Sequence, residues 1–319
     1  MPETNPPSSG PYYLGFDGGG TKTDCFLVDA GSNVLAHATA GPSNPIRSGY
    51  AKAWFTLSDA ADLVLERCHL KSSDILGICA GIGGAGRDVV ARRIAAFLDR
   101  GFPKAAVMVT TDLEITLQAG VGDGQGVILV VGTGSAAYGR DAEGHIARAG
   151  GRGPWYSDEG SGFDIGRRAM AAVVRAEEKR GPATALSQKM FHWLGVKDWS
   201  RVLDWVVKNP DDVFPRIFPL VAELGDQGDT VACEILSSAA ESLAELAASV
   251  LQKLSMQDRE VPIAIAGGTI GRSQFFDAAI ESGLVRVAPR ASLVSLHVKP
   301  AEAAARMAIR LGKRKAHGG

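Results

Sequence analysis

Near the start of the chain, an acid, three glycines and several polar residues follow one another in the segment 16–24. Consecutive glycines let backbone N–H groups crowd around an anion such as a phosphate. Thr21, Lys22 and Thr23 could add side-chain donors, while the carboxylate of Asp17 could hold a hydrated divalent cation against the same phosphates. The segment predicts a phosphate-binding turn, although a glycine-rich hairpin turn without any ligand has the same pattern.

Three later segments carry residues of related types. Asp112 follows an apolar run at 107–109, so its carboxylate would emerge at the carboxyl end of a strand, where ligands collect in open α/β sheets. It could take a proton from a substrate hydroxyl, or it could simply cap the helix that follows. The other two segments are rich in glycine and hydroxyl groups, and they comprise Gly132, Thr133, Gly134 and Ser135, and then Gly267 and Gly268.

The elements that would position these residues form two similar sets. In the first set, apolar runs predict strands at 12–16, 25–28, 33–39, 75–80 and 105–110, and helical spacing predicts helices at 51–67, 88–98 and from 113 onward. The second set has predicted strands at 126–131, 136–139, 146–149, 261–266 and 292–298, and helices at 164–179, 183–194, 199–207, 213–224, 230–254 and 273–281. A last helix is predicted at 301–311. The alternation is typical of mixed sheets covered by helices, and the two strand-turn-strand openings suggest a duplicated domain.

The length of 319 residues is enough for two domains, because single cores stop growing near roughly 250 to 300 residues. We expect an N-terminal domain formed by residues 1–119 plus 300–319, and a C-terminal domain formed by residues 120–299. The composition of the segments 1–10 and 313–319 predicts frayed ends.

The net charge and the spacing of the cysteines argue against several classes of binding partner. Lys and Arg number 34 against 35 Asp and Glu, which supplies no electrostatic case for nucleic acid or an anionic membrane. The four cysteines are scattered without metal-ligand spacing, and no apolar run reaches the roughly 20 residues of a membrane helix. We therefore expect a cytoplasmic protein that acts on a small molecule.

The order of these motifs resembles that of the sugar kinase, Hsp70 and actin superfamily. Within it, residues 13 to about 311 are similar to the N-acetylglucosamine kinases and the BadF/BadG/BcrA/BcrD-type ATPases. The most specific match is Asp158-Glu159-Gly160-Ser161, which lies in the glycine-rich segment 150–162. The resemblance implies an α/β protein with two ribonuclease H-like (actin-like ATPase) domains that face an interdomain cleft, the second being rich in helices.

The resemblance also implies ATP and Mg²⁺ as cofactors and an amino-sugar substrate, N-acetylglucosamine phosphorylated at its 6-hydroxyl; we expect a homodimer. Asp112 would be the catalytic residue, and Asp17 would act through Mg²⁺-bound water. The implied nucleotide-binding residues are Gly18, Gly19, Gly20, Thr21, Lys22, Thr133, Gly134, Ser135, Gly267 and Gly268. The implied sugar-binding residues are Asn44, Asp112, Gly151, Arg152, Gly153, Asp158 and Glu159.

Several of these assignments have alternatives. Asn44 could be a turn former, and Glu159 could be a second acceptor or a charge at a helix start. Arg152 stands where the family usually has Trp; it could pair with a carboxylate or phosphate, or it could point to solvent. An arginine that pairs with a carboxylate would suit a related acidic amino sugar. The alternative acceptors are glucosamine and N-acetylmuramic acid. At the level of function, the alternatives are a BadF-type ATPase that couples hydrolysis to another process, and a nucleotide switch without sugar-stimulated turnover.

Overall fold

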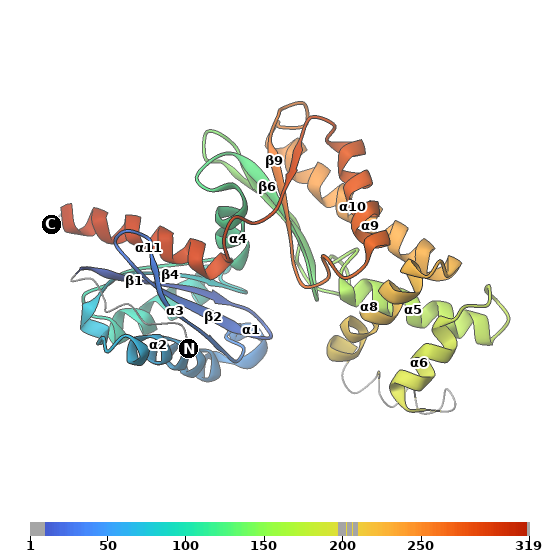
Figure 1. The fold of residues 1–319 in the computed structure, drawn as a ribbon, viewed down its shortest axis with the longest axis horizontal. Helices are drawn as coiled ribbons and strands as arrows, with labels where there is room; N and C mark the ends of the chain where they lie inside the picture. The colour runs from blue at the N-terminus through green and yellow to red at the C-terminus, as the bar shows by residue number, and fades with distance from the viewer. Residues whose placement is uncertain (1–9, 197–201, 203–205, 207–209, 318–319) are drawn as a thin grey trace. The chain divides into compact units, whose positions relative to one another are not determined.

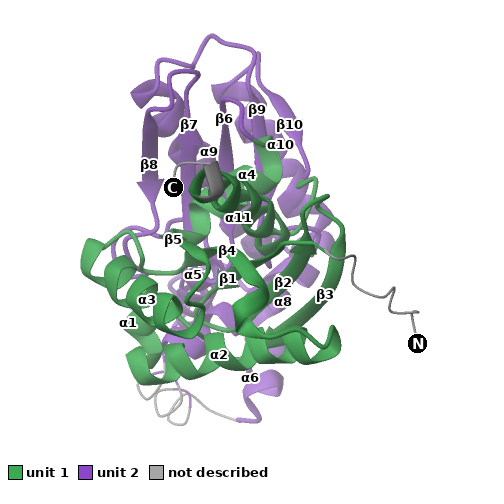
Figure 2. Cartoon of the chain, turned by 90° about the vertical axis from the view of Figure 1, so that its left-hand side faces the viewer, with its two compact units in different colours: residues 1–122, 296–319 green, residues 123–295 purple. Residues whose placement is uncertain are grey.

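The structure of the protein is a computed structural model that describes residues 10–196, 202, 206 and 210–317 (Figure 1). The chain divides into two compact units, which Figure 2 colours separately: unit 1 comprises residues 1–122 and 296–319, and unit 2 comprises residues 123–295. The helix predicted at 199–207 lies outside the described residues except at positions 202 and 206. In the described ranges, no helix is both long enough and apolar enough to span a membrane.

Unit 1 contains a five-stranded mixed sheet with the strand order β3-β2-β1-β4-β5. Its strands are β1 (Tyr12–Gly18), β2 (Thr23–Asp29), β3 (Val34–Ala40), β4 (Ile75–Ile82) and β5 (Ala106–Thr110). β1 and β2 form an antiparallel hairpin, whereas β1, β4 and β5 run parallel to one another. β1 and β2 are buried on both faces, which is why they read as continuous apolar runs in the sequence.

Helices cover both faces of this sheet. Their bounds are α1 (Pro45–Ser48), α2 (Tyr50–Arg67), η1 (Ser72–Asp74), α3 (Asp88–Gly101), α4 (Asp112–Val121) and α11 (Pro300–His317). Residues of α2 and α3 share one apolar core with the sheet, and residues of α4 and α11 share another. The backbone of α11 lies very close to β1, because a Cβ on Gly15 would come within 2.1 Å of the Ala305 nitrogen.

Unit 2 repeats the strand order with its own five strands, which pair as β10-β9-β6-β7-β8. The strands are β6 (Gly126–Val131), β7 (Ser135–Arg140), β8 (Ile146–Gly150), β9 (Pro262–Ala266) and β10 (Ser292–Val294). Read from the other edge, the order matches that of unit 1: a hairpin with a third antiparallel strand on one side and two parallel strands on the other. The predicted α/β fold with two mixed sheets is confirmed.

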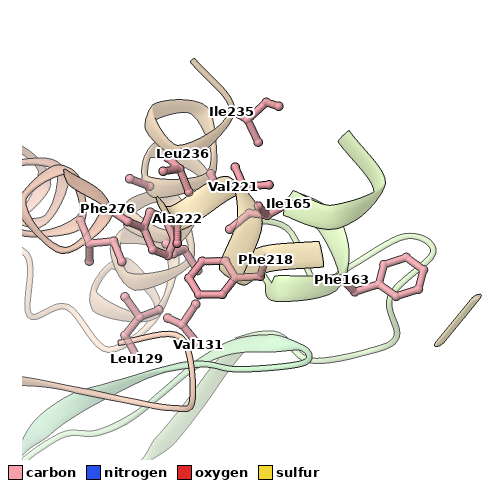
Figure 3. Packing of buried hydrophobic residues seen from close by; sticks show 14 of the residues in the cluster. Leu129, Val131, Phe163, Ile165, Phe218, Val221, Ala222, Ile235, Leu236 and Phe276 are labelled. Atoms are coloured by element: carbon pink, nitrogen blue, oxygen red, sulfur yellow. The ribbon is translucent and has the colours of Figure 1, made fainter. Parts of the chain in front are cut away.

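The second unit carries more helix than the first between its third and fourth strands. Its helices are α5 (Gly162–Glu177), α6 (Leu186–Leu194), α8 (Pro210–Asp226), α9 (Thr230–Lys253) and α10 (Gln274–Val287). They bury one extended core against the sheet; Figure 3 shows Phe218 of α8 and Phe276 of α10 near Leu129 and Val131 of β6. The rings of Phe218 and Phe276 lie 5.9 Å apart.

The described structure differs from two of the predicted boundaries. The last helix continues to His317, so the expectation of a frayed end from residue 313 is wrong as far as residue 317. The reason is local: Lys315 donates to the carbonyl oxygen of Ala105 at 3.0 Å, which ties this turn to unit 1. β10 is also shorter than predicted, since it ends at Val294 instead of residue 298.

Candidate functional site

The tip of the first hairpin is held by two other loops of unit 1. The Gly19 nitrogen donates to the carbonyl oxygen of Lys22 at 2.9 Å and closes the turn. The Gly19 carbonyl in turn accepts from the nitrogens of Ser43 and Asn44 at 3.1 and 3.0 Å. The Gly18 carbonyl accepts from the Gly83 nitrogen at 2.8 Å. The predicted phosphate turn, the 41–44 loop and the glycine loop after β4 therefore meet at one edge of the sheet.

The carboxylates of Asp17 and Asp112 converge at this same edge. In the sheet, Asp17 pairs with Gly81, which in turn pairs with Thr110, and Asp112 follows two residues later. Burial, the charge of Asp112 and then that of Asp24 raise the pKa of Asp17 to about 7, against a smaller opposing effect of Lys22. The edge therefore holds excess negative charge.

Asp112 is not the cap of the helix that it begins. The N-cap of α4 is Thr111, whose side chain accepts from the Glu114 nitrogen at 3.1 Å, and Asp112 is the first residue inside the helix. The alternative that Asp112 serves as an N-cap is therefore wrong. Since α4 starts directly after β5, the half-buried Asp112 lies at the carboxyl end of a parallel strand and at the positive end of a helix dipole.

The side chain of Lys22, which was predicted to donate to a phosphate, forms an ion pair within its own hairpin in this structure. Its Nζ lies 2.6 Å from Oδ2 of Asp24, while Thr39 donates to the other oxygen of that carboxylate at 2.6 Å. Burial alone would raise the pKa of Asp24, but the hydrogen bonds from Lys22 and Thr39 outweigh it and leave the pKa below its ordinary value. Lys22 is thus tied back to its own hairpin.

Asn44 is placed by its role at the start of α1. Its side-chain oxygen accepts from the Ile46 nitrogen at 3.0 Å, which makes it the N-cap of this short helix. Its side-chain nitrogen lies over the glycine loop after β4, because a Cβ on Gly83 would come within 2.9 Å of it. The capping function is observed, and it leaves the amide nitrogen as the donor that a sugar could use.

The second hairpin has a glycine tip that is bound to the start of α5. The Gly132 nitrogen donates to the Gly134 carbonyl at 2.8 Å, and the Gly132 carbonyl accepts from the Gly162 nitrogen at 2.8 Å. Ser135 Oγ donates to the backbone oxygen of Glu159 at 2.6 Å. The predicted second phosphate turn and the Asp-Glu-Gly-Ser segment therefore form one local structure in unit 2.

Asp158 is the buried acid of this segment. Its carboxylate accepts from the Gly153 nitrogen at 3.1 Å, and its other oxygen lies against the tip of the second hairpin, where a Cβ on Gly134 would come within 2.5 Å of it. Glycine at 134 is thus required for this approach. The side chain of Glu159 is exposed and lies two residues before Ser161, the N-cap of α5, while the acid in the first turn of that helix is Asp164.

The glycines 150–153 form an irregular segment between β8 and Asp158. Gly151 and Gly153 have positive φ angles of 67° and 134°, as the predicted close backbone approach of a ligand would allow. The Arg148 guanidinium donates to the carbonyl oxygens of Gly150 and Gly151 and holds the start of the segment. Arg152 is exposed, which agrees with the alternative in which its side chain faces solvent.

Gly267 and Gly268 follow β9 and lie beside the second hairpin. A Cβ on Gly267 would come within 2.0 Å of the Val131 carbonyl oxygen, and this residue has φ of 124°, so only glycine fits there. Thr269 Oγ1 donates to the same carbonyl at 2.7 Å. The two predicted nucleotide-binding segments of unit 2 are therefore adjacent in space.

A pocket of about 300 Å³ opens at this junction. It is lined by Gly132, Thr133, Gly162, Pro215, Phe218, Pro219, Gly268, Thr269 and Arg272. Hydrophobic walls with a few polar groups and a glycine turn at the margin are typical of a site for a flat, partly apolar ligand with an anionic end. Sequence reasoning did not identify Pro215, Phe218, Pro219 or Arg272, since the first three come from α8 and Arg272 lies in the turn before α10.

A second, smaller pocket of about 170 Å³ has Asp158 among its lining residues. It is lined by residues 154–159 together with Asp164, Arg167 and Arg168. The two arginines pair with the carboxylate of Asp164 at 3.0 and 2.8 Å. Its remaining acids are Asp158 and Glu159, so this pocket favours a ligand that donates hydrogen bonds, such as one with several hydroxyl groups.

Comparison with known proteins places these motifs in a family. The model of the BadF/BadG/BcrA/BcrD ATPase family matches residues 14–308. An N-acetylmuramic acid/N-acetylglucosamine kinase from Clostridium acetobutylicum is 30% identical over 287 residues, which are 89% of this chain and 94% of that protein. An N-acetyl-D-glucosamine kinase from Dictyostelium discoideum is 27% identical over 310 residues, or 93% of this chain and 97% of that protein.

Solved structures agree with the fold. A proposed N-acetylglucosamine kinase from Chromobacterium violaceum superimposes with a TM-score of 0.76 at 27% identity, covering 96% of this chain and all (100%) of that one. A ROK family glucokinase from Streptomyces griseus, solved with glucose and AMPPNP, has a TM-score of 0.59 at 16% identity and covers 94% of this chain and 99% of that one. The second likeness is one of fold alone.

Proposed function

Because the chain belongs to the BadF/BadG/BcrA/BcrD ATPase family, we propose that it is an ATP-dependent amino-sugar kinase. The observation that carries the chemistry is the meeting of Asp17 and Asp112 at the glycine turn of unit 1. Phosphoryl transfer depends mostly on positioning and on neutralising charge, and one group must orient the attacking hydroxyl. The site offers a residue for each of these tasks.

Asp112 would accept the proton of the acceptor hydroxyl. A carboxylate within hydrogen-bond reach is the usual general base for a hydroxyl nucleophile. Asp112 is half-buried at the start of α4, and its Oδ1 accepts from the Leu113 nitrogen at 3.1 Å. The proton of the hydroxyl would therefore move to an Asp112 carboxylate oxygen, beside the turn that would bind the transferred phosphoryl group.

Asp17 would hold Mg²⁺ at the same edge. Carboxylate oxygens are the ligands that Mg²⁺ prefers. Burial, and then the negative charge of Asp112, raise the pKa of Asp17 to about 7, and a bound cation would favour its charged form. The bound ion would offset the charge of the phosphates. The residues present therefore fit the metal.

Unit 2 would bind the rest of the substrates. The apolar pocket lined by Phe218 and Gly268 suits an adenosine, and the N–H groups of Thr133 and Gly134 in the turn at its margin suit the phosphates. Asp158 and the second pocket would accept hydrogen bonds from sugar hydroxyls. In unit 1, the Asn44 amide would contribute a further donor to the sugar.

The acceptor that we favour is N-acetylglucosamine, phosphorylated at its 6-hydroxyl. Two relatives with 27–30% identity carry this sugar in their names, and one of them also carries N-acetylmuramic acid. A third relative, named a glucosamine kinase and found in Vibrio cholerae, is 27% identical over 73% of this chain. Glucosamine and N-acetylmuramic acid therefore remain the alternative acceptors.

A coupled ADP-release assay with purified protein tests this proposal. The substrates are glucose, glucosamine, N-acetylglucosamine, N-acetylmannosamine and N-acetylmuramic acid, each with MgATP. We expect ADP release that depends on an amino sugar and is highest with N-acetylglucosamine. ADP release of equal rate without sugar would instead support an ATPase of the BadF type, and nucleotide binding without turnover would support a switch.

A further inference from the structure

Arg47 lies against the turn of the first hairpin, although no motif in the sequence predicts a role for it. It belongs to the short helix α1, three residues after Asn44. A Cβ on Gly20 would come within 3.1 Å of both Cδ and Nη1 of Arg47. The absence of a side chain at position 20 therefore leaves room for the arginine over the backbone of the turn.

The position of Arg47 is defined by the backbone that precedes it. The nitrogens of Ser43 and Asn44 both donate to the Gly19 carbonyl, so the start of α1 is attached to the same turn. The Arg47 nitrogen then donates to the Asn44 carbonyl at 3.1 Å within the short helix. Arg47 is thus held next to the hairpin tip by three hydrogen bonds that involve no long side chain.

Lys22 and Arg47, the two cationic side chains at this turn, differ in whether they form an ion pair. Lys22 is paired with Asp24 at 2.6 Å. Arg47 is exposed, and its guanidinium has no hydrogen bond, ion pair or ring contact within the part of the chain that the structure describes. The guanidinium is therefore the positive group at this turn that remains available to an anion.

We propose that Arg47 binds the terminal phosphate of the nucleotide at the glycine turn of unit 1. The proposal rests on the proposed function, since it takes ATP as the ligand. A guanidinium donates two parallel hydrogen bonds that match phosphate oxygens. Asp17 and Asp112 lie at this edge and would repel a triphosphate, so a cation is needed beside the turn. The terminal phosphate is the one that the Asp112-activated hydroxyl would attack.

The competing explanation is structural. Arginine often packs its aliphatic stem on a surface while its charge stays in water, and the contact of Cδ with Gly20 fits that behaviour as well. The two explanations differ in one measurable quantity, the dependence of nucleotide affinity on Arg47. They also differ in which phosphate is affected.

The experiment measures the dissociation constants of MgADP and Mg-AMPPNP by titration calorimetry in the absence of sugar. The variants are Arg47→Gln, Arg47→Lys, Lys22→Gln and Arg100→Gln. Arg100 is the matched control, because it is an exposed arginine in the last turn of α3 and therefore at the opposite edge of the sheet. Thermal unfolding of each variant without ligand checks that it is folded.

For Arg47→Gln we expect affinity for Mg-AMPPNP to fall about 10-fold or more, as for loss of a charge-assisted hydrogen bond, and affinity for MgADP to fall less than about 3-fold. Arg47→Lys should recover part of the loss, Lys22→Gln should lose less than Arg47→Gln, and Arg100→Gln should match the unaltered protein. Equal affinities for Arg47→Gln and Arg100→Gln, or equal losses for both nucleotides, would overturn the proposal.

The same measurements separate this inference from the proposed function. If the unaltered protein binds Mg-AMPPNP but releases no ADP in response to any sugar, the kinase proposal fails while the assignment of Arg47 is still decided by the titrations. If sugar-dependent ADP release is present and Arg47→Gln binds both nucleotides normally, the kinase proposal stands and the assignment of Arg47 is wrong.

Discussion

One residue pair before the tip of the hairpin, unit 1 has Asp17 opposite Asp24, whereas unit 2 has Val130 opposite Ala136 at the equivalent step. The two sheets have the same strand order, and both hairpins end in glycine-rich turns. The acids that could hold a metal or take a proton at the hairpin edge lie in unit 1. Unit 2 instead has an apolar pocket beside its hairpin and a buried acid, Asp158, that accepts from a backbone N–H. One architecture thus supports two different kinds of binding surface.

The glycines of unit 2 give the largest expected effect. Gly267→Ala places a Cβ within 2.0 Å of the Val131 carbonyl oxygen at a φ of 124°, whereas a Cβ on Gly268 would meet no atom within 4 Å. We expect Gly267→Ala to lower the free energy of unfolding by about 3 kcal/mol or more, and Gly268→Ala to change it by about 0.5 kcal/mol or less. Thermal unfolding followed by circular dichroism measures both, and equal melting temperatures would contradict the close approach.

The next effect concerns Asp112, the acid of unit 1 that has no equivalent role in unit 2. Asp112→Asn should lower kcat for sugar phosphorylation by about 100-fold or more, because the amide cannot accept the proton, while affinity for MgADP changes little. Steady-state kinetics and titration calorimetry separate the two quantities. Near-normal kcat in this variant would remove Asp112 from the role of general base.

Substitution of Asp17 should raise the free energy of unfolding, whereas Gly267→Ala should lower it, and the change should be smaller. Its pKa is raised to about 7 from an ordinary value of 3.8, so the unfolded chain loses this proton between about pH 4 and pH 7 while the folded chain keeps it. Stability is therefore lost as pH rises through this window, and the cost is fully present above about pH 7. Asp17→Asn removes that cost.

We expect Asp17→Asn to raise the free energy of unfolding by about 2 kcal/mol at pH 8 in the absence of nucleotide and Mg²⁺, with no gain near pH 4. The value is set below the full linkage figure because Asp17 is not completely buried. Urea unfolding at the two pH values is the measurement. The same gain at both would show that the substitution acts through packing and not through charge.

The smallest predicted effect separates the two acids of the Asp-Glu-Gly-Ser segment. Asp158 is buried at 9% exposure and accepts from the Gly153 nitrogen, whereas Glu159 is exposed. Asp158→Asn should therefore raise the KM for the sugar by about 10-fold, and Glu159→Gln by about 2-fold or less. Sugar titrations at saturating MgATP compare them, and a larger change for Glu159→Gln would reverse the assignment of the sugar-binding acid.

The repeated elements of the fold were readable from the sequence because their signals are local. The strands of both hairpins are short apolar runs on either side of a glycine-rich turn, and the structure has them as β1, β2, β6 and β7. The N-cap of α4 could not be predicted from the local sequence, because Thr111 and Asp112 are both good capping residues. The hydrogen bond from the Glu114 nitrogen to Thr111 Oγ1 identifies Thr111 as the cap.

The contacts that involve distant segments could not be read in this way. Phe218 and Arg272 meet Gly268 in one pocket, yet 54 residues separate the first two (272 minus 218), and nothing in either segment suggests a ligand. Lys22 had the right chemistry for a phosphate, but its partner Asp24 is two residues away, and a strand alternation alone does not show that the side chains meet. Arg47 belongs to no sequence motif that would predict a binding role.

The return of α11 to unit 1 has a consequence for how the protein is made. The alanine face of this helix, which includes Ala301, Ala305 and Ala308, packs on β1 and β4, where Gly15 and Gly77 admit its backbone. The ribosome must synthesise all of unit 2, residues 123–295, before this helix exists. Until then the central strands of unit 1 have only α4 on one apolar face, and the part that α11 would cover stays exposed. Such surfaces are prone to aggregation and to binding by chaperones. Completion of the first unit therefore waits for synthesis of the second.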